Sequence, residues 1–124
     1  MTRLFLACNV LAFGGFGLLM FFAPQTAVDF LGAPSVSADG FYELRGIYGG
    51  VSLGAALLFL AGVLKPDMQR PALYFILAYT GGYALARIAA LPLDGIPSAR
   101  FRFFAGFEIV SALAALYLLR RNAG

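Results

Sequence analysis

The sequence contains no histidine, a single cysteine and few charged residues, and each shortage excludes a class of function. Without histidine, the chain cannot hold bis-histidine haem or histidine-bound zinc or di-iron, and it has no imidazole general base. Cys8 stands alone, which excludes an intramolecular disulfide and a cysteine-based metal cluster. No nucleophile–base pair or cofactor loop can be assembled from the remaining residues. We therefore expect no metal, no cofactor and no enzymatic activity.

Charged residues make up only 12% of the chain, against about 25% in an ordinary soluble domain. Hydrophobic residues make up 61% of its 124 residues, more apolar surface than so short a chain could bury in a core of its own. Lipid is the expected solvent. Because each membrane span takes about 20 residues, four spans would leave only short connections. The sequence thus predicts one all-α domain over 1–124, an integral membrane four-helix bundle with antiparallel, up-and-down topology.

Apolar runs and helix-breaking residues set the limits of the expected spans. The four spans are about 4–23, 41–64, 72–91 and 99–119. Pro24 ends the first span, Pro92 stops the third, and Ser98 is a natural N-cap for the fourth. Arg3 followed by an apolar run also fits a signal peptide. We favour a membrane span, because the run is long for a signal peptide and no clear cleavage site follows it.

The longest connection, 24–40, separates the first two spans. Thr26 and Asp29 form a plausible capping pair within it, which predicts a short interfacial helix around 27–31.

Lysine and arginine residues set the expected orientation in the membrane. With four spans, the amino terminus, the 65–70 link and the carboxyl terminus share one side. The basic residues on that side are Arg3, Lys65, Arg70, Arg120 and Arg121. The positive-inside rule therefore predicts a multi-pass protein of the cell inner (plasma) membrane with both termini in the cytoplasm. No basic stripe with interleaved aromatic residues is present to follow phosphates, so we expect no nucleic acid partner.

Small residues recur every four positions along the second span, at Gly46, Gly50 and Gly54. Between helices in lipid, close backbone contact across small residues supplies the association. This ridge is predicted to pack helices within the bundle, or alternatively to form a homodimer interface.

Ionisable residues inside three spans are the most informative feature of the sequence. At 1.5 Å per residue, Arg45 and Arg87 lie roughly 7 Å, and Glu108 roughly 14 Å, below the outer ends of their spans. Glu43 lies just above Arg45. Charges within a membrane are costly unless they are paired or hydrated. We therefore expect Glu108 and Glu43 to pair with Arg87 and Arg45 around a cavity that opens outward.

Tyrosines are spaced to face the same cluster. Tyr79, Tyr83 and Arg87 are four residues apart and share one helix face, and Tyr48 follows Arg45 by three. Three interpretations remain open at this point. The residues form a buried ion-pair clamp that fixes helix register, a ligand site, or a path for protons or ions.

Several of these residues carry a resemblance. The run Glu43-Leu44-Arg45-Gly46-Ile47-Tyr48-Gly49-Gly50, then Arg87, then Asp94-Gly95-Ile96-Pro97-Ser98, then Glu108 resembles the bacterial family called domain of unknown function 4345 over about residues 40–121, with a looser match in the first span. That family is related to the broader DoxX-like group. The resemblance implies a short four-helix membrane protein and supplies no activity. Its characteristic polar residues would be Glu43, Arg45, Arg87, Asp94 and Glu108.

Two functions follow from these observations. In the first, an outward pocket of Arg, Glu and Tyr side chains binds a small anionic or amphipathic molecule, because arginines near tyrosines suit a carboxylate or phosphate. In the second, the protein is a structural or accessory subunit of a larger membrane complex, and its charged residues form a buried clamp. In both cases the lipid bilayer is an expected partner.

Overall fold

The computed structural model describes residues 1–33 and 35–123. Residues 34 and 124, which fall in the predicted 24–40 connection and at the end of the predicted 1–124 domain, lie outside the described residues. Within residues 1–33 and 35–123, every regular element is helical, and four helical segments are long and apolar enough to cross a membrane. These segments are Thr2–Phe22, Ala38–Leu64, Pro66–Asp94 and Ala99–Asn122. The predicted all-α fold with four membrane-length helices is therefore confirmed.

The chain forms two compact units, residues 1–69 and the unit that begins at Arg70. Helix α1 (Thr2–Phe22) opens the first unit. Its buried residues recur every three or four positions and include Leu6, Asn9, Phe13, Gly17 and Met20. That spacing follows the 3.6-residue turn of an α-helix, so one stripe of α1 is available for packing while the rest stays exposed.

The second span is a composite helix. It begins with α3 (Ala38–Leu44), continues through the π-helical segment η1 (Arg45–Gly50), and ends with α4 (Val51–Leu64). Ser37 caps its start, because the Ser37 side chain accepts a hydrogen bond from the Gly40 backbone N–H at 3.2 Å. In η1 the Val51 N–H donates to Gly46 O, five residues back, so this turn takes one residue more than an α-helical turn.

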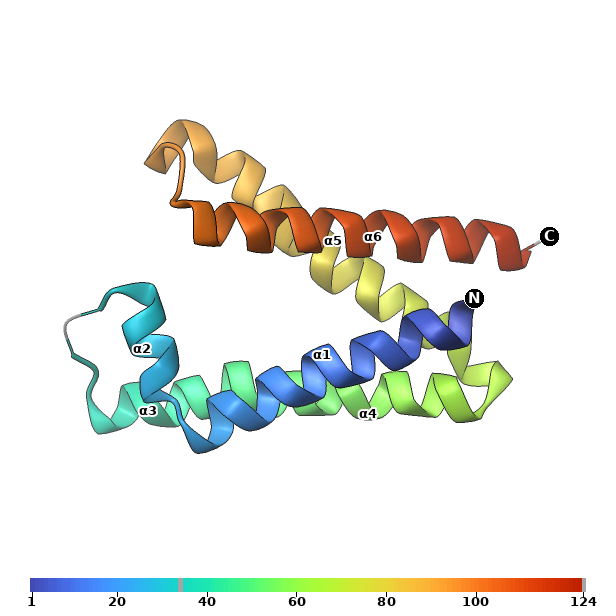
Figure 1. Ribbon diagram of the computed structural model, residues 1–124, viewed down its shortest axis with the longest axis horizontal. Helices are drawn as coiled ribbons and strands as arrows, with labels where there is room; N and C mark the ends of the chain where they lie inside the picture. Colours follow the sequence, from blue (N-terminus) through green and yellow to red (C-terminus); the bar gives the residue numbers. More distant parts are fainter. Residues whose placement is uncertain (34, 124) are drawn as a thin grey trace. The chain divides into compact units, whose positions relative to one another are not determined.

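Helices α1 (blue) and α4 (green) lie side by side and antiparallel in Figure 1. Phe13 meets Phe59 edge to face, with ring centroids 5.1 Å apart. Farther along the seam, a Cβ on Gly17 would lie 2.9 Å from Leu53 Cγ and 3.0 Å from Gly49 O. Only a residue without a side chain allows this approach, so glycines bring the two helix backbones into contact, as small residues do between membrane helices.

The predicted glycine ridge does not take part in this seam. Gly46, Gly50 and Gly54 are exposed, and a Cβ on Gly46 or Gly54 would meet no atom within 4 Å. Gly49 faces α1 instead. The predicted ridge assumes α-helical spacing, whereas the extra residue in η1 changes which positions share a helix face. The packing role of this ridge stays a prediction.

The first connection contains α2 (Gln25–Leu31), so the predicted short helix is present. It begins two residues earlier than expected, with Pro24 rather than Thr26 at its N-cap and no side-chain cap. Thr26 and Asp29 do not form the expected capping pair, because α2 already includes Thr26. Asp29 instead accepts a hydrogen bond from Gln25 Nε2 at 2.8 Å, one helical turn away. The unit ends with a single 3₁₀ turn, η2 (Pro66–Met68), after α4.

The second unit is a hairpin of α5 (Gln69–Asp94) and α6 (Ala99–Ala123). Figure 1 shows these helices crossing, and a Cβ on Gly81 would lie 4.0 Å from Ala112 Cβ near the middle of both. The prediction that Pro92 stops the third span is wrong: α5 includes Pro92 and ends after Asp94. Gly95 supplies the stop, because it adopts φ +81° and its N–H donates to Leu91 O at 2.9 Å.

Candidate functional site

Arg87 on α5 and Glu108 on α6 form the predicted ion pair. Arg87 Nε donates to Glu108 Oε2 at 2.5 Å, and Nη2 donates to Oε1 at 2.9 Å. The two parallel bonds form a bidentate pair, the strongest arrangement that arginine makes with a carboxylate. The Glu108 side chain is only 12% exposed and that of Arg87 33%. The pair therefore joins the two helices of the second unit at a largely covered position.

Aromatic rings line α5 leading up to this pair. The Arg87 guanidinium lies 5.5 Å from the centroid of the Tyr83 ring, within the range of a cation–π interaction. The Tyr83 ring is 5.1 Å from that of Tyr79, and Tyr79 stacks on Phe75 at 5.6 Å. Each step is four residues, so the predicted common face of Tyr79, Tyr83 and Arg87 is present. We call Tyr83, Arg87 and Glu108 the ion-pair cluster.

Arg45, in the first unit, has a backbone partner instead of a carboxylate. Its Nε donates to Phe21 O at 2.9 Å. Phe21 lies in the last turn of α1, where carbonyl groups lack a partner within the helix and where the helix dipole favours a cation. Arg45 therefore fastens the end of α1 to the π-helical turn of the second span.

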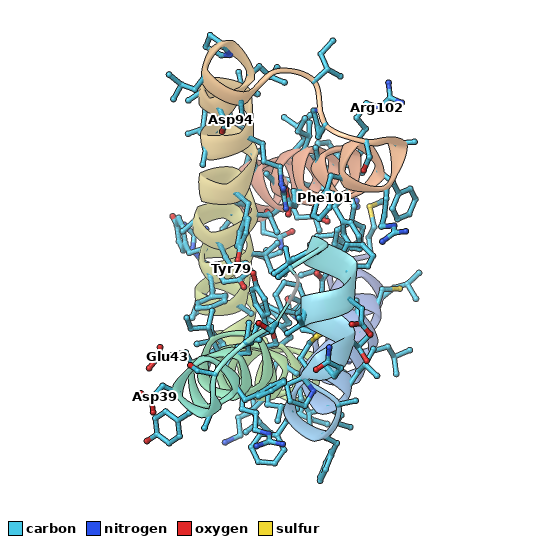
Figure 2. All side chains as sticks on the ribbon, turned by 90° about the vertical axis from the view of Figure 1, so that its left-hand side faces the viewer. Asp39, Glu43, Tyr79, Asp94, Phe101 and Arg102 are labelled. Carbon is cyan, nitrogen blue, oxygen red and sulfur yellow. The ribbon has the colours of Figure 1, made fainter. Side chains whose placement is uncertain are left out.

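Glu43 does not form the expected ion pair with Arg45. The two residues are two positions apart, and side chains at that spacing point to different sides of a helix. Figure 2 shows Glu43 and Asp39 projecting from α3 on the side away from α2. The predicted partnership between Glu43 and Arg45 is therefore wrong.

An open hollow of about 450 Å³ lies beside Arg45, within the first unit. Its lining includes Phe22, Pro24, Gln25, Ala38, Phe41 and Arg45. The hollow exists because α1 ends at Phe22 and the chain turns into α2 opposite the start of α3. Most of its lining is apolar, and the guanidinium of Arg45 adds positive charge at one side.

The remaining predicted residues fall in separate places. Tyr48 on η1 is half-buried, and its ring lies 6.0 Å from that of Phe16 on α1. Both Tyr48 and Arg45 thus contact α1, although at different heights. Asp94 is exposed and is the last residue of α5, where Figure 2 labels it. Of the predicted residues, only Tyr83, Arg87 and Glu108 form the ion-pair cluster in the second unit, and Arg45 lines the hollow in the first.

Comparison with known families agrees with the earlier resemblance and extends it. The family model described as domain of unknown function (DUF4345) matches residues 1–119. The chain belongs to the DUF4345 family. The match includes the ion-pair cluster, the Arg45 hollow and the whole first span, where the resemblance is looser. No curated protein and no solved structure matches the chain.

The hollow of this DUF4345 chain contains residues that sequence reasoning missed. Phe21 contributes only a backbone carbonyl, and Phe22, Pro24, Gln25 and Phe41 carry no charge. One signal could have indicated the carbonyl: Pro24 ends the first helix, and the last carbonyls before a helix end need partners from elsewhere. An arginine near such an end is a natural donor.

Among the residues that the structure describes, no three Cys, Asp or Glu side chains come together as metal ligands would. One unit holds an ion pair in which Arg87 is bonded to both oxygens of Glu108. The other holds Arg45, which has further N–H donors beside an open hollow.

Proposed function

We propose that this DUF4345 protein is a multi-pass protein of the inner membrane that binds an anionic, amphipathic molecule at the Arg45 hollow and performs no catalysis. The observation that carries the proposal is the position of one guanidinium. Arg45 Nε is held by Phe21 O, and the group lies beside a hollow of about 450 Å³ with largely apolar walls.

Donor groups remain on Arg45 for a ligand. A guanidinium carries five N–H donors, and the bond to Phe21 O uses one of them. Within residues 1–33 and 35–123, no carboxylate pairs with the Nη groups of Arg45. The Nε bond fixes the plane of the guanidinium, so the Nη groups are preorganised for a carboxylate or phosphate, which arginine binds in a bidentate manner.

The ion-pair cluster has a different role in this proposal. Both oxygens of Glu108 are occupied by Arg87, and the Tyr83 ring lies 5.5 Å from the guanidinium carbon. A bidentate pair between the two helices suits a clamp that fixes the register of α5 against α6. We assign the cluster to structure and Arg45 to binding.

The test is native mass spectrometry of the protein purified in mild detergent. We expect a bound anionic molecule in the wild type and its loss in Arg45→Gln. Arg102→Gln is the matched control, because Arg102 is also an exposed arginine and does not line the hollow. Equal retention in both variants would contradict the proposal.

A second candidate function is that of an accessory subunit, which packs against a larger membrane complex or against a second copy of this chain. The observation that favours it is the uncovered ridge Gly46, Gly50 and Gly54. In a Cys8→Ala background, Gly54→Cys would then crosslink in native membranes to one discrete product. Gly15→Cys on α1, which also faces open space, serves as the control. Equal crosslinking at both positions would contradict a specific interface.

A further inference from the structure

We infer that the occupant of the Arg45 hollow is a phospholipid of the surrounding bilayer, held through its phosphate. This inference rests on the proposed binding function and names its ligand. Three features of the first unit carry it: the depth of Arg45 along its helix, the distribution of charge around the hollow, and the apolar walls.

The depth of Arg45 coincides with the level of lipid phosphates. The helical segment Ala38–Leu64 is continuous, and Lys65 follows directly at its far end. Arg45 precedes Lys65 by 20 residues, which is about 30 Å at 1.5 Å per residue. The hydrocarbon core of a bilayer is about 30 Å thick. With Lys65 at one boundary, Arg45 therefore lies at the other, where phosphate groups begin.

Charge around the hollow favours an anion. Arg45 is the charged residue in the lining. No carboxylate is among the lining residues that the structure describes: Asp39 and Glu43 project from α3 on the side away from α2 in Figure 2, and Asp29 accepts the Gln25 amide at 2.8 Å. An anion in the hollow would thus meet the guanidinium of Arg45 as the charged group in the lining.

The walls of the hollow distinguish a lipid from a soluble anion. Phe22, Pro24 and Phe41 present apolar surface beside the guanidinium. Phe22 is 74% exposed, so its ring is available to an occupant. A small hydrophilic anion would leave these groups uncovered, whereas the glycerol and upper acyl segments of a phospholipid would cover them. Burial of apolar surface adds to affinity in such sites.

The experiment measures adducts on the full-length protein in dodecyl maltoside by native mass spectrometry. Three probes are titrated separately: dioleoylphosphatidylglycerol, sn-glycerol 3-phosphate and dioleoylglycerol. The variants are Arg45→Gln, which removes the guanidinium, and Ala38→Trp, which fills the hollow and leaves Arg45 in place. Arg102→Gln is the control, and circular dichroism melting verifies that each variant is folded.

We expect one dioleoylphosphatidylglycerol per chain, bound at least about tenfold more weakly by Arg45→Gln because a charge-assisted pair is lost. Ala38→Trp should weaken it similarly, and Arg102→Gln should not. Equal binding of dioleoylglycerol would overturn the inference, because the phosphate would then be irrelevant. Arg45-dependent binding of glycerol 3-phosphate without a preference for the lipid would also overturn it, and would reduce the proposed function to an anion site at Arg45. No Arg45-dependent binding of any probe would reject both.

Discussion

Gly17 and Gly49 place the backbones of α1 and η1 in direct contact: a Cβ on Gly17 would lie 3.0 Å from the carbonyl oxygen of Gly49. The contact is reciprocal, because a Cβ on Gly49 would lie 3.0 Å from Phe21 Cβ and 3.1 Å from Phe21 Cα. The bond from Arg45 to Phe21 O lies in the same region of the seam. The close packing at Gly49 and the Arg45 bond therefore meet at the same residue, Phe21.

Gly17→Ala should destabilise the protein by about 1–3 kcal/mol, because the added methyl group meets backbone atoms that cannot move independently. Gly15→Ala is the matched control on the same helix, since a Cβ there meets nothing within 4 Å. Thermal unfolding in detergent measures both. Equal melting temperatures for the two variants would show that the α1–η1 contact is looser than described.

Removal of Glu108 should be more harmful than removal of both members of its pair. Glu108→Ala leaves the Arg87 guanidinium without its bidentate partner inside a membrane span, at a cost of about 1–3 kcal/mol. The double variant Arg87→Ala/Glu108→Ala should recover part of that loss in a double-mutant cycle of thermal unfolding. Strict additivity would mean that the two side chains do not interact in the folded protein.

Gly95→Ala tests the end of α5 without changing any packing. Gly95 has φ +81°, and a Cβ there would meet nothing within 4 Å, so the cost is conformational alone. We expect a loss of about 1–2 kcal/mol in unfolding free energy, the penalty for the left-handed region. Gly106→Ala on α6, which also faces open space at an ordinary φ, should show no such loss.

Reporter fusions test the expected orientation. Fusions after residue 68 and at the carboxyl terminus should report a cytoplasmic location, and a fusion near Ser35 should report an external one. The physical reason is the retention of lysine and arginine on the cytoplasmic side. A cytoplasmic signal near Ser35 would be incompatible with four spans in this orientation.

The ion pair could be predicted because it depends on features that a sequence displays. Arg87 and Glu108 are charged, lie within apolar runs, and fall in the same half of two helices joined by a short turn. Unpaired charges in lipid are expensive, so few arrangements remain. The approximate positions of the four long helices were predictable for a similar reason, but their ends differ by a few residues, as at Ala38 and at Pro92, which lies inside α5 while the helix ends before Gly95.

The partner of Arg45 could not be predicted in this way. The helix end before Pro24 indicates that the last carbonyls of α1 need partners, but it does not indicate which of them Arg45 would reach, because backbone carbonyls are chemically alike. The π-helical turn could not be predicted from the sequence either, because it is defined by which backbone N–H donates to which carbonyl. The face presented by Gly46, Gly50 and Gly54 depended on that turn and was therefore uncertain from spacing alone.

The π-helical segment also means that the second span holds one residue more than a regular α-helix of the same number of turns. If the same six residues, Arg45–Gly50, wound as a regular α-helix, the wider turn would no longer absorb the extra residue. Since each residue of an α-helix advances about 100°, the segment Ala38–Leu44 would then rotate by about that angle relative to α4. Arg45 would leave Phe21 O, and the hollow would lose its guanidinium. The π-helical hydrogen bonding of this segment therefore sets the direction in which Ala38–Leu44 and the Arg45 side chain project.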